Sequence, residues 1–144
     1  MPEISLMPSL GISASALDAE TRRMEVIANN VANANTTRDA NGKVYRRKEV
    51  VFAAQLADAI NSDGTGKQFK GVSVQAIVED GRPMNRDYRP GHPDADANGY
   101  VTMPNVNTLE EMVDMMSASR SYEANLAAIR TAKGMASQAL EIIK

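Results

Sequence analysis

The residues best suited to chemistry lie together in the stretch GHPDAD. His92, Asp94 and Asp96 carry the imidazole and carboxylate groups that bind divalent cations. The chain has one histidine and no cysteine, so no second imidazole or thiolate can complete a common site. Pro90 and Pro93 favour an extended backbone around this histidine. We therefore predict a loop with no bound metal ion.

Catalytic patterns are equally weak. No serine lies in the Gly-x-Ser-x-Gly arrangement of a nucleophile elbow. The stretch GTG at 64–66 is followed by Lys-Gln-Phe, and not by the Gly-Lys-Ser/Thr of a phosphate-binding loop. The adjacent carboxylates of Glu110 and Glu111 are better explained by the start of a helix, where anions are favoured. The sequence therefore predicts no enzymatic activity and no cofactor.

The composition argues against nucleic-acid and membrane partners. The formal net charge is −2 over 144 residues, and both signs are mixed along the chain. The basic cluster YRRK at 45–48 is predicted on a strand, where alternate side chains point to opposite faces. No apolar run is long enough to span a membrane, and the N-terminus lacks the pattern of a cleaved signal peptide. These features favour the cytoplasm, or export by a route that leaves the N-terminus intact.

Two long rows of residues spaced by three and four positions predict the main elements. The first row consists of Leu10, Ala14, Leu17, Thr21, Met24, Ala28 and Val31, and Asn35 continues it. The second consists of Met112, Met115, Ser119, Tyr122, Leu126, Ile129, Lys133, Ala136, Leu140 and Ile143. Such rows are the seams of coiled-coil helices. We predict helices about 40 and 55 Å long that pair with each other.

The start of the second helix and the middle of the chain have their own signals. Asn107 with Glu110 resembles a capping box. Strands are predicted over 44–54 and 71–80, with a loop between them, and the following segment to position 98 is predicted to be irregular. The stretches DANGKV and DANGYV, which begin at Asp39 and Asp96, predict two matching type I′ turns. The fold class is mainly α with a small β-rich middle, divided into regions 1–38, 39–105 and 106–144.

Four asparagines near the end of the first helix need an explanation, because asparagine is a mediocre helix former. They are Asn29, Asn30, Asn33 and Asn35. In one interpretation the amides only cap the ending helix. In the other, Asn29 and Asn33 lie one turn apart on one face and fix the register against a neighbouring protein. The methionines at 112, 115 and 116 likewise fit either a plain core or an adaptable interaction surface.

Several of these stretches also resemble a known family. ANNVANANTT at 28–37 is similar to the N-terminal signature of the rod and hook axial proteins of bacterial flagella. DANGKVYRRKEVVF, PGHPDADANGYVTMPNVN and SASRSYEAN are similar, more specifically, to the proximal-rod subunits. The resemblance covers almost the whole chain.

The resemblance implies a structural subunit that is exported unprocessed through the flagellar type III apparatus. It implies helical stacking with its own copies, with neighbours of the FlgB, FlgF and FliE types and with the distal rod subunit. The resulting hollow rod would cross the periplasm, form part of the export channel and transmit motor torque. The alternative is a soluble coiled-coil binding module or an export chaperone.

The predicted subunit interface combines residues of both helices. It consists of Leu17, Met24, Ala28, Asn29, Val31, Asn33, Asn35, Met112, Met116, Ser119, Tyr122, Asn125, Leu126 and Ile129.

Overall fold

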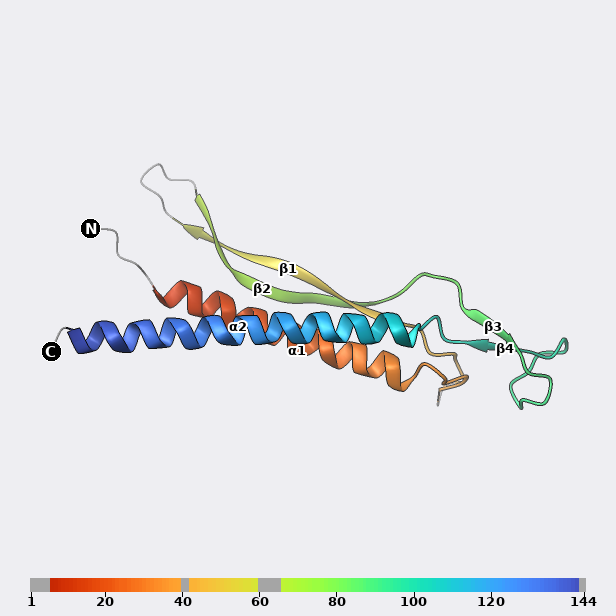
Figure 1. Ribbon diagram of the computed structural model, residues 1–144. Coiled ribbons are helices and arrows are strands. Elements are labelled where there is room, and N and C mark those ends of the chain that lie inside the picture. The colour runs from red at the N-terminus through yellow and green to blue at the C-terminus, as the bar shows by residue number, and fades with distance from the viewer. Residues whose placement is uncertain (1–5, 40–41, 60–65, 143–144) are drawn as a thin grey trace.

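A computed structural model describes residues 6–39, 42–59 and 66–142. Two long helices, α1 (Leu6–Ala32) and α2 (Thr108–Ile142), lie side by side and run antiparallel (Figure 1). Between them the chain forms two antiparallel hairpins. The long hairpin consists of β1 (Lys48–Ala59) and β2 (Gly66–Glu79), and the short one of β3 (Asn85–Tyr88) and β4 (Tyr100–Met103). The predicted fold class, with paired terminal helices around a small β-rich middle, is confirmed.

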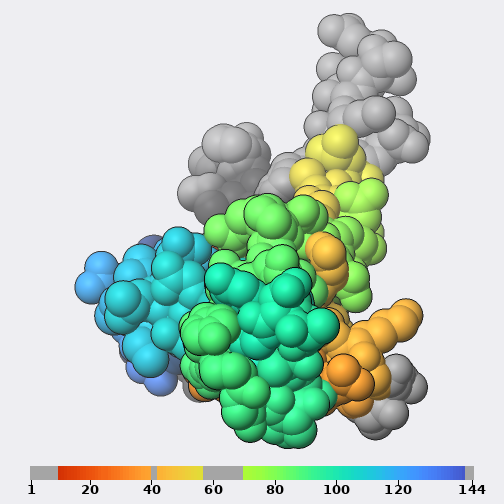
Figure 2. Space-filling view, turned by 90° about the vertical axis from the view of Figure 1, so that its right-hand side faces the viewer, coloured from red at the N-terminus to blue at the C-terminus, as the bar shows by residue number. Residues whose placement is uncertain are grey.

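Helix α1 is the central element. It packs against α2 on one side and against β1 and β2 on another, whereas α2 contacts no other helix or strand within the described residues. Figure 2, viewed from the end that carries β3 and β4, shows α2 (blue) on one side and the long hairpin (yellow and green) rising on the other. Helix α1 therefore lies between α2 and the long hairpin, and it contacts both.

The face of α2 that packs on α1 follows a coiled-coil repeat. Because α1 is the only element that α2 contacts, its buried and half-buried positions mark the shared seam. Besides Asp114, Ser119, Ser121 and Leu126, they include a regular row at alternating steps of four and three: Glu111, Met115, Ala118, Tyr122, Asn125, Ile129, Ala132 and Ala136. Four of them, at 115, 122, 129 and 136, match the predicted row. Of the other predicted positions, Ser119 and Leu126 are half-buried beside this row, Met112, Lys133 and Leu140 are exposed, and Ile143 lies outside the described residues.

The predicted seam of α1 is only partly buried within the subunit. The buried residues of α1 and its C-terminal turn are Ala19, Val26, Ile27, Asn30 and Ala34. In the predicted row, Ala14, Thr21 and Ala28 are exposed, whereas the four larger residues are half-buried: Leu10, Leu17, Met24 and Val31. A second row at 12, 16, 19, 23, 26 and 30 has the same spacing and lies two residues away, which is about 200° around the helix. Since α1 carries small or apolar residues on several faces, spacing alone did not identify the buried face.

The strands of the long hairpin extend further toward its turn than predicted. β1 starts at Lys48 and not at position 44, and β2 starts at Gly66, so part of the predicted loop is strand. The register shifts between Val51 and Phe52 and again between Gln55 and Leu56. These irregularities interrupt the predicted alternation: Val72, Val74 and Ala76 are half-buried, but Val78 is exposed.

The two DANG stretches form equivalent turns. Gly42 N–H donates to the Asp39 carbonyl at 3.0 Å, and Gly99 N–H donates to the Asp96 carbonyl at 2.9 Å. Both glycines have positive φ, 74° and 80°, but Asn98 does not. The second turn is therefore type I followed by a left-handed glycine, and not the predicted type I′ turn. Asn41 lies outside the described residues.

The segment between β2 and α2 is more ordered than the sequence suggested. Instead of a wholly irregular connection to position 98, it contains β3, which pairs with β4 in register from Asn85–Met103 to Tyr88–Tyr100. The start of α2 agrees with the prediction. The Asn107 side-chain oxygen accepts the Leu109 N–H at 3.1 Å, and its amide donates to Glu110 at 3.0 Å. Asn107 is thus the N-cap of α2.

Candidate functional site

His92 and Asp94, which the sequence offered as potential metal ligands, make structural contacts at the tip of the molecule. His92 Nδ1 accepts the Asp94 N–H at 3.1 Å, while the Asp94 carboxylate accepts from Thr37 at 2.8 Å and pairs with Arg38 at 2.7 Å. These contacts tie the chain that leaves α1 to the tip. The backbone forms successive turns around His92, so the predicted extended conformation is wrong. Within the described ranges, no group of three or more His, Asp or Glu side chains is arranged to hold a metal ion.

A buried polar cluster, which we call the junction, lies where α1, α2 and their connecting segments meet. Its centre is Asn30, whose side chain is inaccessible to solvent. The Asn30 amide donates to the Lys48 carbonyl at 2.8 Å and to Glu111 at 2.9 Å. Its oxygen accepts from the Lys48 N–H and from the Tyr45 hydroxyl, both at 2.9 Å. All four hydrogen-bonding positions of this amide are therefore used.

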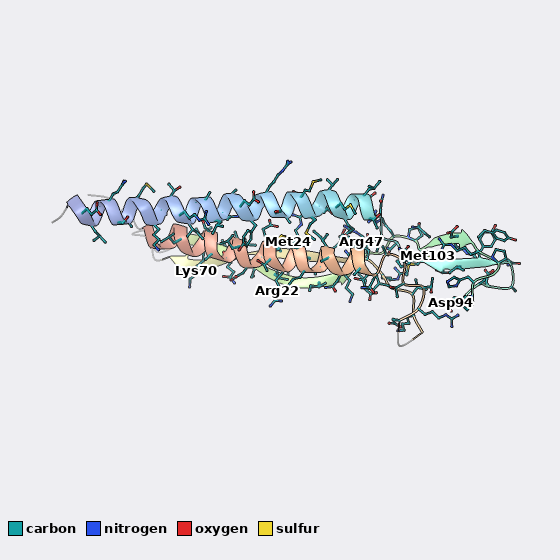
Figure 3. All side chains as sticks on the ribbon, turned by 60° about the horizontal axis from the view of Figure 1, so that its bottom comes forward. Arg22, Met24, Arg47, Lys70, Asp94 and Met103 are labelled. Atoms are coloured by element: carbon teal, nitrogen blue, oxygen red, sulfur yellow. The ribbon has the colours of Figure 1, made fainter. Side chains whose placement is uncertain are left out.

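Arg47 supplies the positive charge of the junction (Figure 3). Its Nε donates to Glu111 at 2.5 Å, and the remaining guanidinium nitrogens contact Glu49, Asp80 and Asp114. Its backbone N–H donates to the side chain of Asn105 at 2.9 Å. Since both Arg47 and Glu111 are buried, each ion is acceptable only because the other is present.

The electrostatics of the junction follow from this burial. Burial alone would lower the pKa of Arg47, but its bonds to Glu111 and Glu49 outweigh that effect and raise the pKa. Burial raises the pKa of the Tyr45 hydroxyl, and the negative charge of Glu111 adds to the shift. The pKa of Asp80 is lowered because it accepts the backbone N–H of Arg82 and then the Arg82 guanidinium. All these groups keep their neutral-pH charge states in the fold.

The sequence did not point to this cluster. Tyr45, Arg46 and Arg47 precede β1 and are not on a strand as predicted, and Arg47 is buried. Asn30 was only one of four asparagines, and Glu111 was explained by helix capping. The available signal was that Asn30 and Glu111 fall on the apolar spacing of their helices. A polar residue on such a row predicts a buried partner.

The second candidate surface is an exposed apolar patch near the start of α2. It consists of Leu109, Met112, Val113 and Met116, which are 72%, 52%, 60% and 53% exposed. Their spacing places them on one side of the helix, opposite the seam with α1. The buried hydrophobic residues of the subunit are mostly alanine and valine. The largest apolar side chains of this helix turn are therefore left outside the core.

The predicted interface residues do not form one continuous patch in the subunit. Those that are half-buried are Leu17, Met24, Val31, Asn33, Ser119, Tyr122, Asn125, Leu126 and Ile129. Those that are exposed are Ala28, Asn29, Asn35, Met112 and Met116. Tyr122, Asn125 and Ile129 lie on the seam between the helices, whereas Met112 and Met116 belong to the exposed patch. No partner chain is present, so their intermolecular role stays a prediction.

The amides of Asn29 and Asn33 bond within their own helix. Asn29 Nδ2 donates to the Glu25 carbonyl at 2.9 Å, and Asn33 Nδ2 donates to the Asn29 carbonyl at 2.8 Å. Both residues line a surface groove between α1 and the base of the long hairpin, together with Tyr45 and Ile77. The amides face an open groove, which leaves the register interpretation possible.

Two family models of flagellar rod proteins match the terminal regions of the chain. The family model for flagella basal body rod proteins matches residues 10–38, and that for the C-terminal part of the flagellar basal body rod FlgEFG proteins matches residues 97–142. No helix in the described part of the chain is long and apolar enough to cross a membrane.

Curated relatives match almost the entire chain. The flagellar basal-body rod protein FlgC of Bacillus subtilis is 47% identical, with 94% of this chain and 97% of the relative covered. FlgC of Salmonella typhimurium is 45% identical over 92% of this chain and 93% of its own length. FlgC of Borreliella burgdorferi is 39% identical over 98% and 99%. At such identity over nearly the full length, the chain belongs to the FlgC family of flagellar basal-body rod proteins.

Proposed function

We propose that this rod subunit assembles helically, with its own copies and with other rod proteins, into the proximal part of the flagellar rod. Neighbours of the FlgB, FlgF and FliE types and the distal rod subunit are the expected partners. Regions 1–38 and 106–144 form the axial core, and region 39–105 lies around it. The chain reaches the periplasm through the flagellar type III export apparatus without a cleaved signal peptide.

The observation that carries this proposal is the exposed patch of Leu109, Met112, Val113 and Met116. Contiguous apolar side chains on one side of a helix are typical of a protein–protein contact. Methionine is flexible and polarisable, so it can pack against neighbours that differ slightly in orientation. A subunit in a helical stack meets several such neighbours. The patch is accordingly the proposed interface.

The junction suggests how the subunit transmits torque. It links α1, the segment before β1, the segment after β2 and the start of α2 through hydrogen bonds and ion pairs. Load applied to one helix is passed to the other elements through these bonds. The proposed role is mechanical and needs no catalytic group.

The test is to place charge on the patch without disturbing the fold. In cells that produce only the double variant Met112→Glu, Met116→Glu, we expect few or no rods in purified basal bodies and loss of swimming, because buried unpaired carboxylates are costly. The matched variant Met112→Leu, Met116→Leu keeps the apolar surface and should retain both. Circular dichroism of the isolated variants checks that folding is equal. Normal rods containing the charged variant would contradict the proposal.

A further inference from the structure

Two exposed methionines lie in the exposed apolar patch of α2. The chain has no cysteine, so its methionine thioethers are the side-chain groups that a peroxide oxidises most readily. Met112 and Met116 are 52% and 53% exposed, and they lie one helical turn apart. Both belong to the surface through which the subunit is proposed to contact its neighbours. An oxidant therefore has access to this surface in the isolated chain.

The structure separates the other methionines by their exposure. Those that are half-buried are Met24, Met84, Met103 and Met115. Met115 is the closest comparison, because it lies on the seam with α1 and between the two patch methionines. Met135 is 52% exposed but lies about five turns beyond Met116, outside the patch. One helix thus carries exposed methionines inside and outside the patch, together with half-buried Met115.

We infer that Met112 and Met116 are oxidation sites that control whether the subunit can join the rod. The reagent is a two-electron oxidant of the peroxide class. The inference rests on the proposed function, and it adds a chemical modification that acts on the proposed interface.

The reaction needs only the thioether and the peroxide. A lone pair of the methionine sulfur attacks one oxygen of hydrogen peroxide, so an S–O bond forms while the O–O bond breaks. The departing hydroxide takes the proton from the transferred oxygen and becomes water. The sulfur loses two electrons, and the peroxide gains them. Methionine sulfoxide reductases reverse the modification.

Oxidation is expected to change the patch much more than the fold. A thioether is apolar, whereas a sulfoxide is polar. Because Met112 and Met116 face solvent in the subunit, their sulfoxides stay hydrated and the α1–α2 seam is not disturbed. In the assembled contact, the same oxygens would be buried without donors arranged to meet them, which is unfavourable. The free chain is therefore sensitive to oxidant, and a neighbouring subunit protects the patch after assembly.

Peptide mass spectrometry of the isolated full chain, treated with hydrogen peroxide, tests the two sites. We expect Met112 and Met116 to be oxidised several-fold faster than Met115, and the urea midpoint of unfolding to stay nearly the same. Equal rates at Met115 and at the patch methionines would overturn the inference. So would a loss of stability on oxidation that the variant Met112→Leu, Met116→Leu avoids.

Purified basal bodies test the protection. The same peroxide treatment should oxidise Met112 and Met116 several-fold more slowly in the rod than in the isolated chain. Equal rates in the two samples would show that the patch stays open in the rod. That result would contradict the proposed interface together with the inference.

Glutamine tests the effect on assembly, because it is close to methionine sulfoxide in size and polarity and carries no charge. In cells that produce only Met112→Gln, Met116→Gln, we expect roughly tenfold fewer rods. The matched variant Met112→Leu, Met116→Leu cannot form sulfoxides at these positions and should keep the normal number. Normal rods from the glutamine variant, with none from Met112→Glu, Met116→Glu, would overturn the inference and leave the proposed function standing. Normal rods from both would contradict the proposed function as well.

Discussion

The two ends of the helix pair are built differently. Near the junction, Asn30 bonds to Glu111 at 2.9 Å and Arg23 lies 3.7 Å from Asp114. Within the described residues, every direct hydrogen bond or ion pair between α1 and α2 involves Glu111 or Asp114. Toward the other end, α2 extends past the start of α1 (Figure 1), and Leu140 is 68% exposed. At one end the helices are joined by internal polar bonds, and at the other no such bond joins them within the described residues.

This difference separates two tasks of a rod subunit. The junction fixes the relative positions of the chain segments before any neighbour is present. In the proposed assembly, the far end and the outer faces are buried by other subunits. A protein with few large buried side chains gains little stability from its hydrophobic core. The polar bonds of the junction therefore largely determine how its chain segments are arranged.

The largest effect on the junction is expected from the removal of Glu111. Glu111→Ala leaves Arg47 with a buried guanidinium that has lost its fully buried carboxylate partner, and it also removes an acceptor from Asn30. We expect the free energy of unfolding to fall by about 3 kcal/mol, the lower part of the range for a broken buried pair, because Glu49 and Asp80 remain near Arg47. Urea unfolding measures this change, and amide hydrogen exchange should show that protection is lost around position 30.

Two further variants separate charge from packing. Glu123→Ala removes an exposed carboxylate from the same helix and should change stability by no more than about 0.5 kcal/mol. The double variant Arg47→Met, Glu111→Leu replaces both charges by apolar side chains and should be less destabilised than Glu111→Ala alone. If Glu111→Ala were as stable as Glu123→Ala, the junction would not hold the fold.

The contact of the long hairpin with α1 provides the next test. Gly71 has φ of 148°, and a Cβ atom there would lie 2.3 Å from Ser15 Oγ. Ser15 Oγ in turn accepts the Val72 N–H at 3.1 Å. Gly71→Ala should therefore lower the free energy of unfolding by about 1–3 kcal/mol through backbone strain and collision.

A double variant divides those two causes. Gly71→Ala, Ser15→Ala removes the colliding hydroxyl but keeps the unfavourable φ and loses the Ser15 bond. We expect it to be more stable than the sum of the two single changes predicts, because the collision is absent. Simple additivity in urea unfolding would show that the glycine is needed for its backbone conformation alone.

The comparison also shows which parts of the fold were readable from the sequence. The existence and pairing of both helices were predictable, because heptad spacing persisted over many turns. The buried face of α1 was not, because the rows through Leu17 and through Ala19 have the same spacing. The short strand β3 was not predicted because its sequence, NRDY, contains no β-branched residue. The pairing of β3 with β4 also depends on the turn at Asp96.

The candidate site likewise has one part that was predicted from the sequence and one that was not. The exposed methionines at 112 and 116 were predicted as interface residues from helical position and family resemblance. The junction was missed because its members, Asn30, Arg47 and Glu111, come from three distant parts of the chain. Burial of a charged side chain is decided by partners that only the tertiary structure brings together.

A smaller effect is expected from acid. The lowered pKa of Asp80 means that its ionised form is favoured by folding. This stabilisation is present above the ordinary aspartate pKa of about 3.9 and is lost as the pH falls through the folded value. In Asp80→Asn, the free energy of unfolding should depend less steeply on pH between about 5 and 3. The slope should not vanish, because Asp96 also has a lowered pKa. An unchanged slope would exclude Asp80 from the junction's electrostatics.

The smallest expected change in stability concerns Asn29 and Asn33, and it separates folding from assembly most sharply. Their amides donate only to carbonyl groups of their own helix, at 2.9 and 2.8 Å. Replacing both by alanine removes these bonds but raises helix propensity by a few tenths of a kcal/mol per residue, so the isolated subunit should unfold at nearly the same urea concentration.

If the amides set register between subunits, partner groups buried in the rod would be left unpaired at about 1–3 kcal/mol each. Every copy would repeat this cost. We therefore expect secretion to continue while basal bodies carry short or missing rods. The single change Gln138→Ala, at an exposed helical amide outside the predicted interface, is the matched control. Wild-type rods and swimming in Asn29→Ala, Asn33→Ala would assign these asparagines to the helix end alone.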